Sequence, residues 1–350
     1  MDATLGPIDV RLDVTDAVAP RLRGGRAGAA GERGADARLV QTAWLFAPRD
    51  PGPAPRVLVC LAGGSYDKRY WHADVPGRDG YSFARHLAGL GFVVLALDHL
   101  GTGGSSDPTG ASAVDLALLR DGDVAAIAEA RRRAERGALC DALPPLADAA
   151  WIGVGHSLGA CLTTMVQASA RPFEAVALLG YTVDVAGLQG DDAGAGGAAL
   201  GSDDAALAAR VLASERRLRA SSGAPDDALS TRLDRARTRA LFHAPDVPDD
   251  VVAADDAAAT RLPVRAAAEV TTEGFVGRFA AAIDVPVFLG IGGGVDVSPA
   301  PHREPAAFPA ARDVTLFVLE GAAHCHNFAS GRHRLWDRLA AWAASLPPRS

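Results

Sequence analysis

Short, nearly continuous apolar runs recur along this chain and alternate with longer stretches of helical periodicity. Six such runs cover residues 56–61, 92–97, 151–154, 175–179, 285–289 and 314–319. Runs of this kind are typical of central parallel strands that are covered on both faces. Two further runs, 8–14 and 39–46, alternate apolar and polar residues and predict half-buried strands near a sheet edge. Helical stretches at 81–90, 113–136, 158–169 and 333–345 complete the pattern, so the sequence predicts a doubly wound, mostly parallel α/β sheet of about eight strands.

One connection in this pattern is far longer than a crossover helix. About a hundred residues separate the runs at 175–179 and 285–289, whereas most connections in compact domains are much shorter. The gap contains two stretches with leucines at helical spacing, 204–220 and 226–242. We therefore expect residues 185–280 to form an inserted helical cap over the C-terminal edge of the sheet. The core then comprises residues 1–184 and 281–350.

Three segments have compositions that predict irregular structure. Residues 21–38 are rich in glycine, alanine and arginine, and residues 187–204 in glycine, alanine and aspartate. Residues 245–256 mix prolines with acidic residues. Such segments bury little apolar surface, so each is predicted to be a loop. The first of them makes residues 1–38 a partly irregular N-terminal segment.

The composition narrows the classes of partner and compartment. The net charge of −7 argues against nucleic acid or an anionic membrane as a partner. No apolar run approaches the roughly 18 residues of a transmembrane helix, and the first residues lack the pattern of a secretory signal. The four cysteines show no C-x-x-C spacing, which favours a reduced, cytoplasmic protein. A small molecule is the expected partner, and the oligomeric state stays open.

The strongest chemical signal is a G-x-S-x-G motif, Gly155-His156-Ser157-Leu158-Gly159. An apolar strand runs into the motif and a helix leaves it. A tight strand-to-helix turn of this kind lifts a serine hydroxyl clear of the sheet, and its small glycines let neighbouring backbone pass close by. The alternative is a glycine turn whose serine caps the helix. The flanking strand and helix favour a nucleophile at Ser157.

A serine nucleophile needs a base, and the base needs a group that orients it. Asp296 follows a buried strand and a glycine loop, and His324 follows the last strand and a short loop. The chain order Ser157, Asp296, His324 is typical of this architecture. All three residues come just after strand ends, where open α/β sheets place their sites.

Alternatives remain for the acid and the base. Asp184 also follows a strand and is the rival acid, because Asp296 is also consistent with a turn or a helix cap. His326, two residues after His324, is the rival base. The His324-x-His326 pair suggests metal ligands, but no third ligand with fixed spacing appears, so we expect no metal site.

Acyl transfer also needs donors for the developing oxyanion. The N–H of Leu158, directly after the serine, is the first expected donor. The second is expected from the loop after strand 56–61, where Gly63 and Gly64 permit a close backbone approach. Gly64 or Ser65 would donate.

Two other glycine-rich segments do not match nucleotide-binding loops. Residues 101–106 lack the Gly-Lys-Ser/Thr of a phosphate loop. Residues 290–295 end on Val295, where a dinucleotide fingerprint needs its third glycine. We therefore expect neither NAD nor ATP, and no other cofactor.

From about residue 40 onward the chain resembles the α/β-hydrolase superfamily. The resemblance rests on Leu61-Ala-Gly-Gly-Ser65, on the stretch Asp98-x-x-Gly-x-Gly-x-Ser105, on the motif at 155–159 and on Gly321-Ala-Ala-His324. It implies a serine hydrolase fold with a variable cap. The chain departs from the common patterns where Ala62 replaces a histidine of the oxyanion loop, and where Ile291-Gly-Gly-Gly-Val-Asp296 stands in place of a Gly-x-x-Asp.

The sequence thus predicts a serine hydrolase that cleaves an acyl bond, with a carboxylic ester of a small apolar molecule as the expected substrate. Ser157 would attack, His324 would move the proton and Asp296 would orient the imidazole. Thioester hydrolysis and carbon–carbon cleavage of a diketone-like substrate are alternatives that use the same triad. A non-catalytic scaffold that binds a small ligand is the alternative from another class.

Overall fold

The structure is a computed structural model that describes residues 4–24, 38–108, 113–183, 185 and 204–347. Its main element is one eight-stranded sheet with the strand order β1-β2-β4-β3-β5-β6-β9-β10. The strands are β1 (Thr4–Asp13), β2 (Val40–Pro48), β3 (Arg56–Leu61), β4 (Val93–Leu97), β5 (Ala150–His156), β6 (Ala175–Leu179), β9 (Val287–Gly292) and β10 (Val314–Leu319). Neighbouring strands in the series β4, β3, β5, β6, β9 and β10 pair in parallel. At one edge, β2 pairs antiparallel with both β4 and β1. The predicted eight-stranded, mostly parallel sheet is confirmed. Of its two alternating runs, one forms the edge strand β1 and the other forms β2, which lies next to it and is largely buried.

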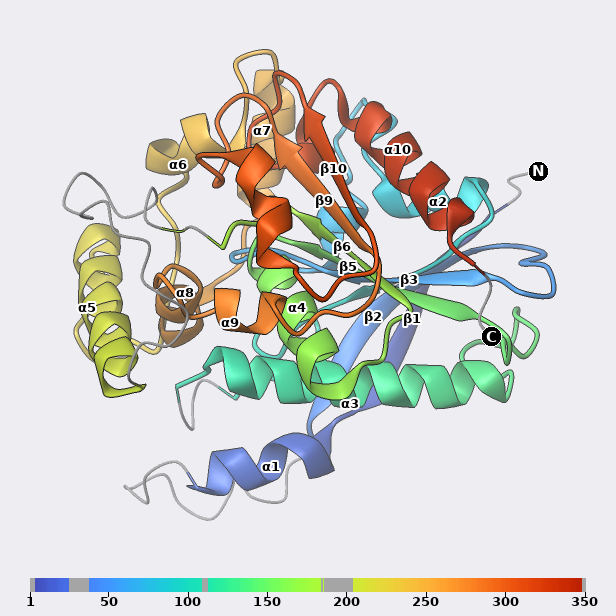
Figure 1. Ribbon diagram of the computed structural model, residues 1–350, viewed down its shortest axis with the longest axis horizontal. Coiled ribbons are helices and arrows are strands. Elements are labelled where there is room, and N and C mark those ends of the chain that lie inside the picture. The colour runs from blue at the N-terminus through green and yellow to red at the C-terminus, as the bar shows by residue number, and fades with distance from the viewer. Residues whose placement is uncertain (1–3, 25–37, 109–112, 184, 186–203, 348–350) are drawn as a thin grey trace.

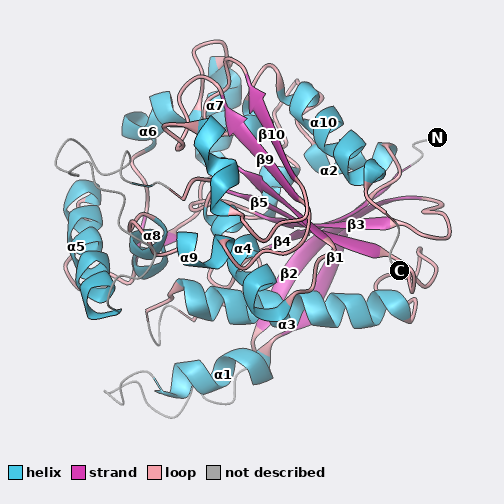
Figure 2. Cartoon of the chain, in the orientation of Figure 1, coloured by secondary structure: helices cyan, strands magenta, loops and turns pink. Residues whose placement is uncertain are grey.

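Helices cover the two faces of the sheet (Figures 1 and 2). On one face lie α3 (Leu116–Glu135) and α4 (Leu158–Ala170), with α1 (Thr15–Gly24) against α3. On the other lie α2 (Phe83–Gly89) and α10 (Arg332–Ser345). Short 3₁₀ helices, among them η1 (Lys68–Trp71), η3 (Pro301–Ala307) and η4 (His326–Phe328), follow strand ends or connect elements. This arrangement confirms the doubly wound architecture.

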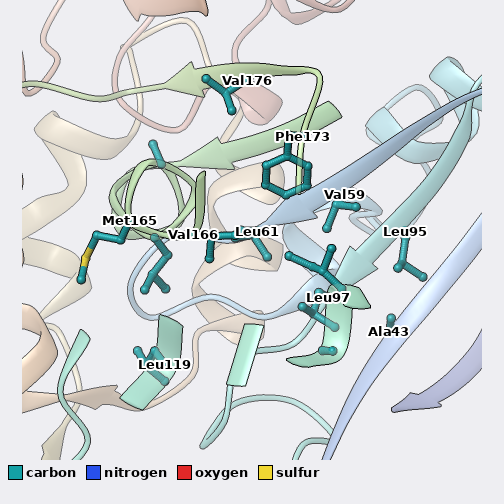
Figure 3. Close-up of a cluster of buried hydrophobic side chains, with 14 of the residues drawn as sticks. Ala43, Val59, Leu61, Leu95, Leu97, Leu119, Met165, Val166, Phe173 and Val176 are labelled. Carbon is teal, nitrogen blue, oxygen red and sulfur yellow. The ribbon is translucent and has the colours of Figure 1, made fainter. Parts of the chain in front are cut away.

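The sheet divides the hydrophobic core into two clusters, because successive strand residues point to opposite faces. Val59 and Leu61 belong to the cluster under α3 and α4, whereas Leu58 and Cys60 belong to the cluster under α2 and α10. Figure 3 shows Val59 and Leu61 beside side chains of the neighbouring strand and of α4. Both faces of β3 are therefore dry, which accounts for its continuously apolar sequence.

Between β6 and β9 the described chain is mainly helical. It contains α5 (Asp204–Ser222), α6 (Arg235–Phe242), α7 (Asp249–Ala258), α8 (Val264–Val270) and α9 (Gly277–Ala280), and a two-stranded pairing of β7 (Ser230–Thr231) with β8 (Leu262–Pro263). Figure 1 shows these helices at one end of the sheet. The cap boundaries at 185 and 280 stay a prediction.

Two predictions in this segment are wrong. Residues 245–256 were expected to be irregular, but α7 occupies most of them. Pro248 precedes the first helical residue, where its missing N–H is not needed, and Asp249 and Asp250 interact favourably with the helix dipole. The helix expected over 226–242 begins only at Arg235, because the Asp234 side chain accepts a hydrogen bond from the N–H of Arg237 and caps it there.

The predicted loops near 21–38 and 187–204 fall largely outside the described residues. Of the first, α1 includes residues up to Gly24, so that part is helical rather than irregular. Of the second, only Asp204 is described, as the first residue of α5. In the described part of the chain, no helix is both long enough and apolar enough to cross a membrane.

Candidate active site

Ser157 lies at the turn between β5 and α4. Its backbone has φ 54° and ψ −120°, which is a strained conformation for a residue with a side chain. The turn is held by a 2.8 Å hydrogen bond from the Ser157 N–H to the Leu179 carbonyl at the end of β6. Its side chain makes no capping hydrogen bond to α4. The helix-cap alternative therefore lacks its defining contact, and the half-buried hydroxyl remains available.

The two glycines of the motif are required by close backbone approach. A Cβ on Gly155 would lie 2.3 Å from the Gly159 carbonyl oxygen. A Cβ on Gly159 would lie 2.1 Å from the Leu61 carbonyl oxygen and 2.5 Å from that of Ala62. The turn after β5 is therefore pressed against the loop after β3, which brings Ser157 next to the glycines of that loop.

His324 and Asp296 meet at the same edge of the sheet. The Nδ1 of His324 lies 2.7 Å from Oδ1 of Asp296, the contact that the sequence predicts. Both side chains are buried. Gly180, directly after β6, makes room for the imidazole, since a Cβ there would lie 2.9 Å from His324 Nδ1. Because the carboxylate accepts the Nδ1 proton, Nε2 of His324 is left as a proton acceptor.

Asp296 is held by four donors. Its Oδ1 also accepts from the N–H of Val297 at 2.7 Å. Its Oδ2 accepts from the N–H of Gly292 at 2.6 Å and lies 2.9 Å from Nε2 of His326. Burial alone would raise the pKa of Asp296, but the two histidines and their hydrogen bonds hold it well below its ordinary value. Asp296 is therefore a carboxylate at neutral pH.

The rival residues stand as follows. His326 is fully buried and its Nε2 lies 2.9 Å from Oδ2 of Asp296, so this nitrogen is occupied by the carboxylate and does not act as the alternative base. Asp184, the rival acid, lies outside the described residues. Both histidines of the His324-x-His326 pair donate to one carboxylate, so they do not form a pair of metal ligands.

A separate group within the described residues, His243, Asp255 and Asp256, has the spacing of metal ligands. The guanidinium of Arg235 bonds to both of its carboxylates. Oδ2 of Asp255 also accepts from the hydroxyl of Tyr66, at 2.9 Å. The position of a cation in this group is thus taken by an arginine side chain.

His156, the variable residue of the motif, supports the base. Its Nε2–H donates to the carbonyl of His324 at 2.8 Å, and its ring stacks on Tyr70 with centroids 4.5 Å apart. Burial and the neighbouring histidines lower the pKa of His156 well below its ordinary value. His156 is therefore a neutral residue that fixes the backbone of His324.

The expected oxyanion donors lie beside Ser157. Leu158 is the first residue of α4, so its N–H has no partner within the helix. Gly64 lies against it, since a Cβ on Gly64 would lie 3.8 Å from Cβ of Leu158. Ser65 is buried with φ 65°, and its hydroxyl has no partner among the described residues. Gly63 is closer still to the nucleophile, because its Cβ would lie 3.1 Å from Cβ of Ser157.

His99 holds the loop that carries these donors. Its Nδ1 lies 3.1 Å from Oδ2 of Asp123, and its Nε2 lies 3.0 Å from the carbonyl of Ala62. Both ring nitrogens thus face acceptors, and an imidazole can donate to both only when it is protonated. Burial opposes that charge, but the carboxylate of Asp123 outweighs it and raises the pKa of His99. In its protonated form His99 donates to both acceptors and so anchors the Ala62 peptide.

The inserted segment contacts both sides of the site. The N–H groups of His324 and Cys325 donate to the carbonyls of Leu241 and Phe242, at the end of α6, at 2.9 Å and 3.0 Å. On the other side, the N–H of Thr260 donates to the carbonyl of Ser65 at 2.8 Å. The described part of the insert therefore lies at the same edge of the sheet as Ser157.

A small cavity lies beside Leu158, the residue after Ser157. This cavity of about 10 Å³, room for about one water molecule, is lined by Gly64, His99, Leu158, Leu262 and neighbouring residues. A larger cavity of about 640 Å³ lies beside η1 and α7 and is lined by Tyr66 and Tyr70. Neither Ser157 nor His324 lines either cavity. The smaller cavity is the one that touches the turn after β5, through Leu158, and the loop after β3, through Gly63 and Gly64.

Comparison with known families decides the affiliation. Residues 58–338 match the sequence model of the alpha/beta hydrolase family. The chain belongs to this family. A comparison with curated proteins finds no match.

Solved structures resemble this α/β hydrolase in fold. A thermophilic esterase from Thermogutta terrifontis has 13% identity and a TM-score of 0.58, with 95% of this chain and 98% of that chain covered. A bromoperoxidase from Bacillus anthracis has 15% identity and a TM-score of 0.58, with 97% and 100% covered. A monoacylglycerol lipase from Paleococcus ferrophilus has 18% identity and a TM-score of 0.54, with 88% and 98% covered. At these identities the likeness shows the fold alone.

Sequence reasoning missed several residues that shape this site. His99 and Asp123 are 24 positions apart and meet only through the fold. The contact of His326 with Asp296 was not foreseen, because His326 was weighed as a base and as a metal ligand. The one available signal for His156 was its place within the G-x-S-x-G motif.

Proposed function

We propose that this α/β hydrolase is a serine hydrolase that cleaves carboxylic esters of small apolar molecules through an acyl-enzyme. The observation that carries the proposal is the 2.7 Å contact between His324 and Asp296 at the sheet edge where the strained turn presents Ser157. A purely structural turn has no need of strain, a buried carboxylate and a base at one place.

In the proposed reaction, Oγ of Ser157 attacks the ester carbonyl carbon while Nε2 of His324 takes the hydroxyl proton. Asp296 stabilises the imidazolium that forms. The tetrahedral oxyanion accepts hydrogen bonds from the N–H of Leu158 and from that of Gly64 or Ser65. The carbon–oxygen bond to the alcohol then breaks, and His324 returns the proton to the leaving alkoxide. Water, deprotonated by His324, hydrolyses the acyl-enzyme by the same steps in reverse.

The lining of the small cavity beside Leu158 supports an apolar substrate. Leu100, Leu119, Leu158 and Leu262 all contribute to it. Because that space holds about one water molecule, an acyl chain would enter only after Leu262 and the adjoining part of the insert move. The insert would therefore set the size of the acyl group that is accepted.

A panel of substrates tests the proposal. Nitrophenyl esters, acyl thioesters and vinylogous diketones are assayed side by side with the wild type and with Ser157→Ala. We expect the esters to be cleaved fastest, and Ser157→Ala to lose about 10⁴-fold or more in kcat while it stays folded. Faster turnover of thioesters or diketones would replace the ester assignment. Retention of more than about a tenth of the activity in Ser157→Ala would refute the nucleophile.

A further inference from the structure

Asp296 is shared by two imidazoles, not one. His324 approaches Oδ1 at 2.7 Å and His326 approaches Oδ2 at 2.9 Å. Each oxygen also accepts one backbone N–H, so the two sides of the carboxylate carry the same kind of donor set. The side chains of Asp296 and His326 are fully buried. An ordinary acid–histidine pair uses one side of its carboxylate, so the second histidine requires an explanation.

The hydrogen bonds fix where the protons are. His326 donates from Nε2, and its buried Nδ1 has no partner among the described residues. A second proton on His326 would therefore be buried without an acceptor, which is costly. His324, in contrast, donates from Nδ1, and its Nε2 is not among the buried atoms of the described residues that lack a partner. Of these two histidines, only His324 can gain a proton without burying an unsatisfied donor.

The other titratable groups around this pair remain uncharged near neutrality. His156 lies with its ring centroid 4.7 Å from that of His324 and has a lowered pKa, chiefly because it is buried. Burial raises the pKa of Tyr70, which lies in η1, and that of Cys325, which lies between the two histidines in the sequence. Further away, Asp255 of the insert is neutralised by its ion pair with Arg235. Asp296 is thus the charge that His324 senses most directly.

We propose that His326 is a positioning residue that acts on His324 through Asp296. Its Nε2–H occupies Oδ2, which fixes the plane of the carboxylate so that Oδ1 points at His324. The same hydrogen bond draws electron density from the carboxylate, so that Asp296 stabilises the protonated form of His324 less strongly. This role rests on the proposed function of the triad.

The test compares two substitutions that differ in one hydrogen bond. His326→Phe removes the donor to Oδ2, while His326→Gln keeps an amide donor that cannot titrate. An NMR pH titration of the His324 ring, assigned with His324→Gln, reads the pKa directly and does not depend on turnover. Loss of a hydrogen bond to a charged group should raise the pKa of His324 by about one unit in His326→Phe. His326→Gln should stay close to the wild type.

Kinetics provide the second readout. The acid limb of kcat/KM should move to higher pH by the same amount in His326→Phe, with kcat reduced by about tenfold to hundredfold. His302→Phe, a substitution of an exposed histidine, should change neither quantity. If His326→Phe does not fold, His326→Asn takes its place, because its shorter amide does not reach Oδ2.

Two outcomes would overturn the proposal. One is an unchanged pKa of His324 in the variant that lacks the donor. The other is that His326→Gln behaves like His326→Phe, which would mean that His326 serves packing alone. Failure of the proposed function would look different: no ester would be turned over by the wild type, while the NMR titration would still report on the coupling of the two histidines.

Discussion

The packing of Gly159 against the loop after β3 leads to a quantitative prediction for Gly159→Ala. The added methyl would lie 2.1 Å from the Leu61 carbonyl oxygen and 2.5 Å from that of Ala62. Both contacts are with backbone, so the loop itself must move by about 1 Å to restore an ordinary separation. Overpacking of this kind costs about 1–3 kcal/mol, and the higher helix propensity of alanine returns less than about 1 kcal/mol. We expect a net loss of about 2 kcal/mol in the free energy of unfolding.

The melting temperature should report this loss. An unfolding entropy of about 2.1 cal/mol/K per residue near 60 °C gives about 0.7 kcal/mol/K for 350 residues. A loss of about 2 kcal/mol should therefore lower Tm by about 3 °C. Because the same loop carries Gly64 and Ser65, a shift of about 1 Å should also reduce kcat toward esters by about a hundredfold.

Gly89→Ala is the matched control. Gly89 is exposed at the end of α2, and a Cβ there would meet nothing within 4 Å. The same added methyl should therefore leave kcat unchanged and raise the free energy of unfolding by up to about 1 kcal/mol. If Gly159→Ala melted and turned over substrate like this control, the proposed contact between the elbow and the oxyanion loop would be wrong.

Two further predictions follow from buried charges. The only lysine of the chain, Lys68, pairs at 2.5 Å with Oδ2 of the buried Asp98, so Lys68→Met should cost about 3–5 kcal/mol in urea unfolding; a cost below about 1 kcal/mol would contradict a buried pair. The pKa of His99 is raised above its ordinary 6.5. The stability that protonation of His99 contributes is therefore complete below about pH 6.5 and is lost as the pH rises through the pKa of His99 in the folded protein. Urea unfolding between about pH 6 and about pH 9 should show the wild type losing its advantage over His99→Gln at the alkaline end, and a pH-independent difference would refute the imidazolium.

The strands could be predicted from the sequence because burial on both faces leaves a direct trace in composition. β3 and β6, which are buried on both faces, begin and end at the residues predicted from their apolar runs. β10 also has the predicted bounds, but it is an edge strand and is mostly half-buried, so its apolar run wrongly predicted a central position. β5 extends two residues beyond its run, to His156, because the sheet continues its hydrogen bonding with β6 into the motif. Backbone pairing of this kind leaves no trace in hydrophobicity.

The inserted segment was predicted less well, for physical reasons that differ between its helices. The acidic residues and prolines near α7 suggested a loop, yet Pro248, Asp249 and Asp250 are favourable at a helix start. The leucines from residue 226 onward suggested one long helix, but Asp234 provides a cap in the middle. Position within the helix, rather than composition, decided both cases.

In the candidate site, too, some residues could be predicted from the sequence and others could not. Ser157, Asp296 and His324 could be proposed because each follows a strand end, which topology brings to one edge. The roles of His99 and Asp123 could not, since a residue in the middle of α3 carries no signal that it pairs with a loop after β4. The two hydrogen bonds from the His324 loop to the end of α6 use backbone groups, which any sequence supplies.

The most direct test of the central claim is labelling with a fluorophosphonate. The reagent reacts with a serine only when a base activates it and an oxyanion site stabilises the product. Mass spectrometry of the labelled, digested protein should find one phosphonyl group on Ser157, and none on the folded Ser157→Ala variant. An unlabelled wild type, or a label on another residue, would contradict the assignment of Ser157 as the nucleophile.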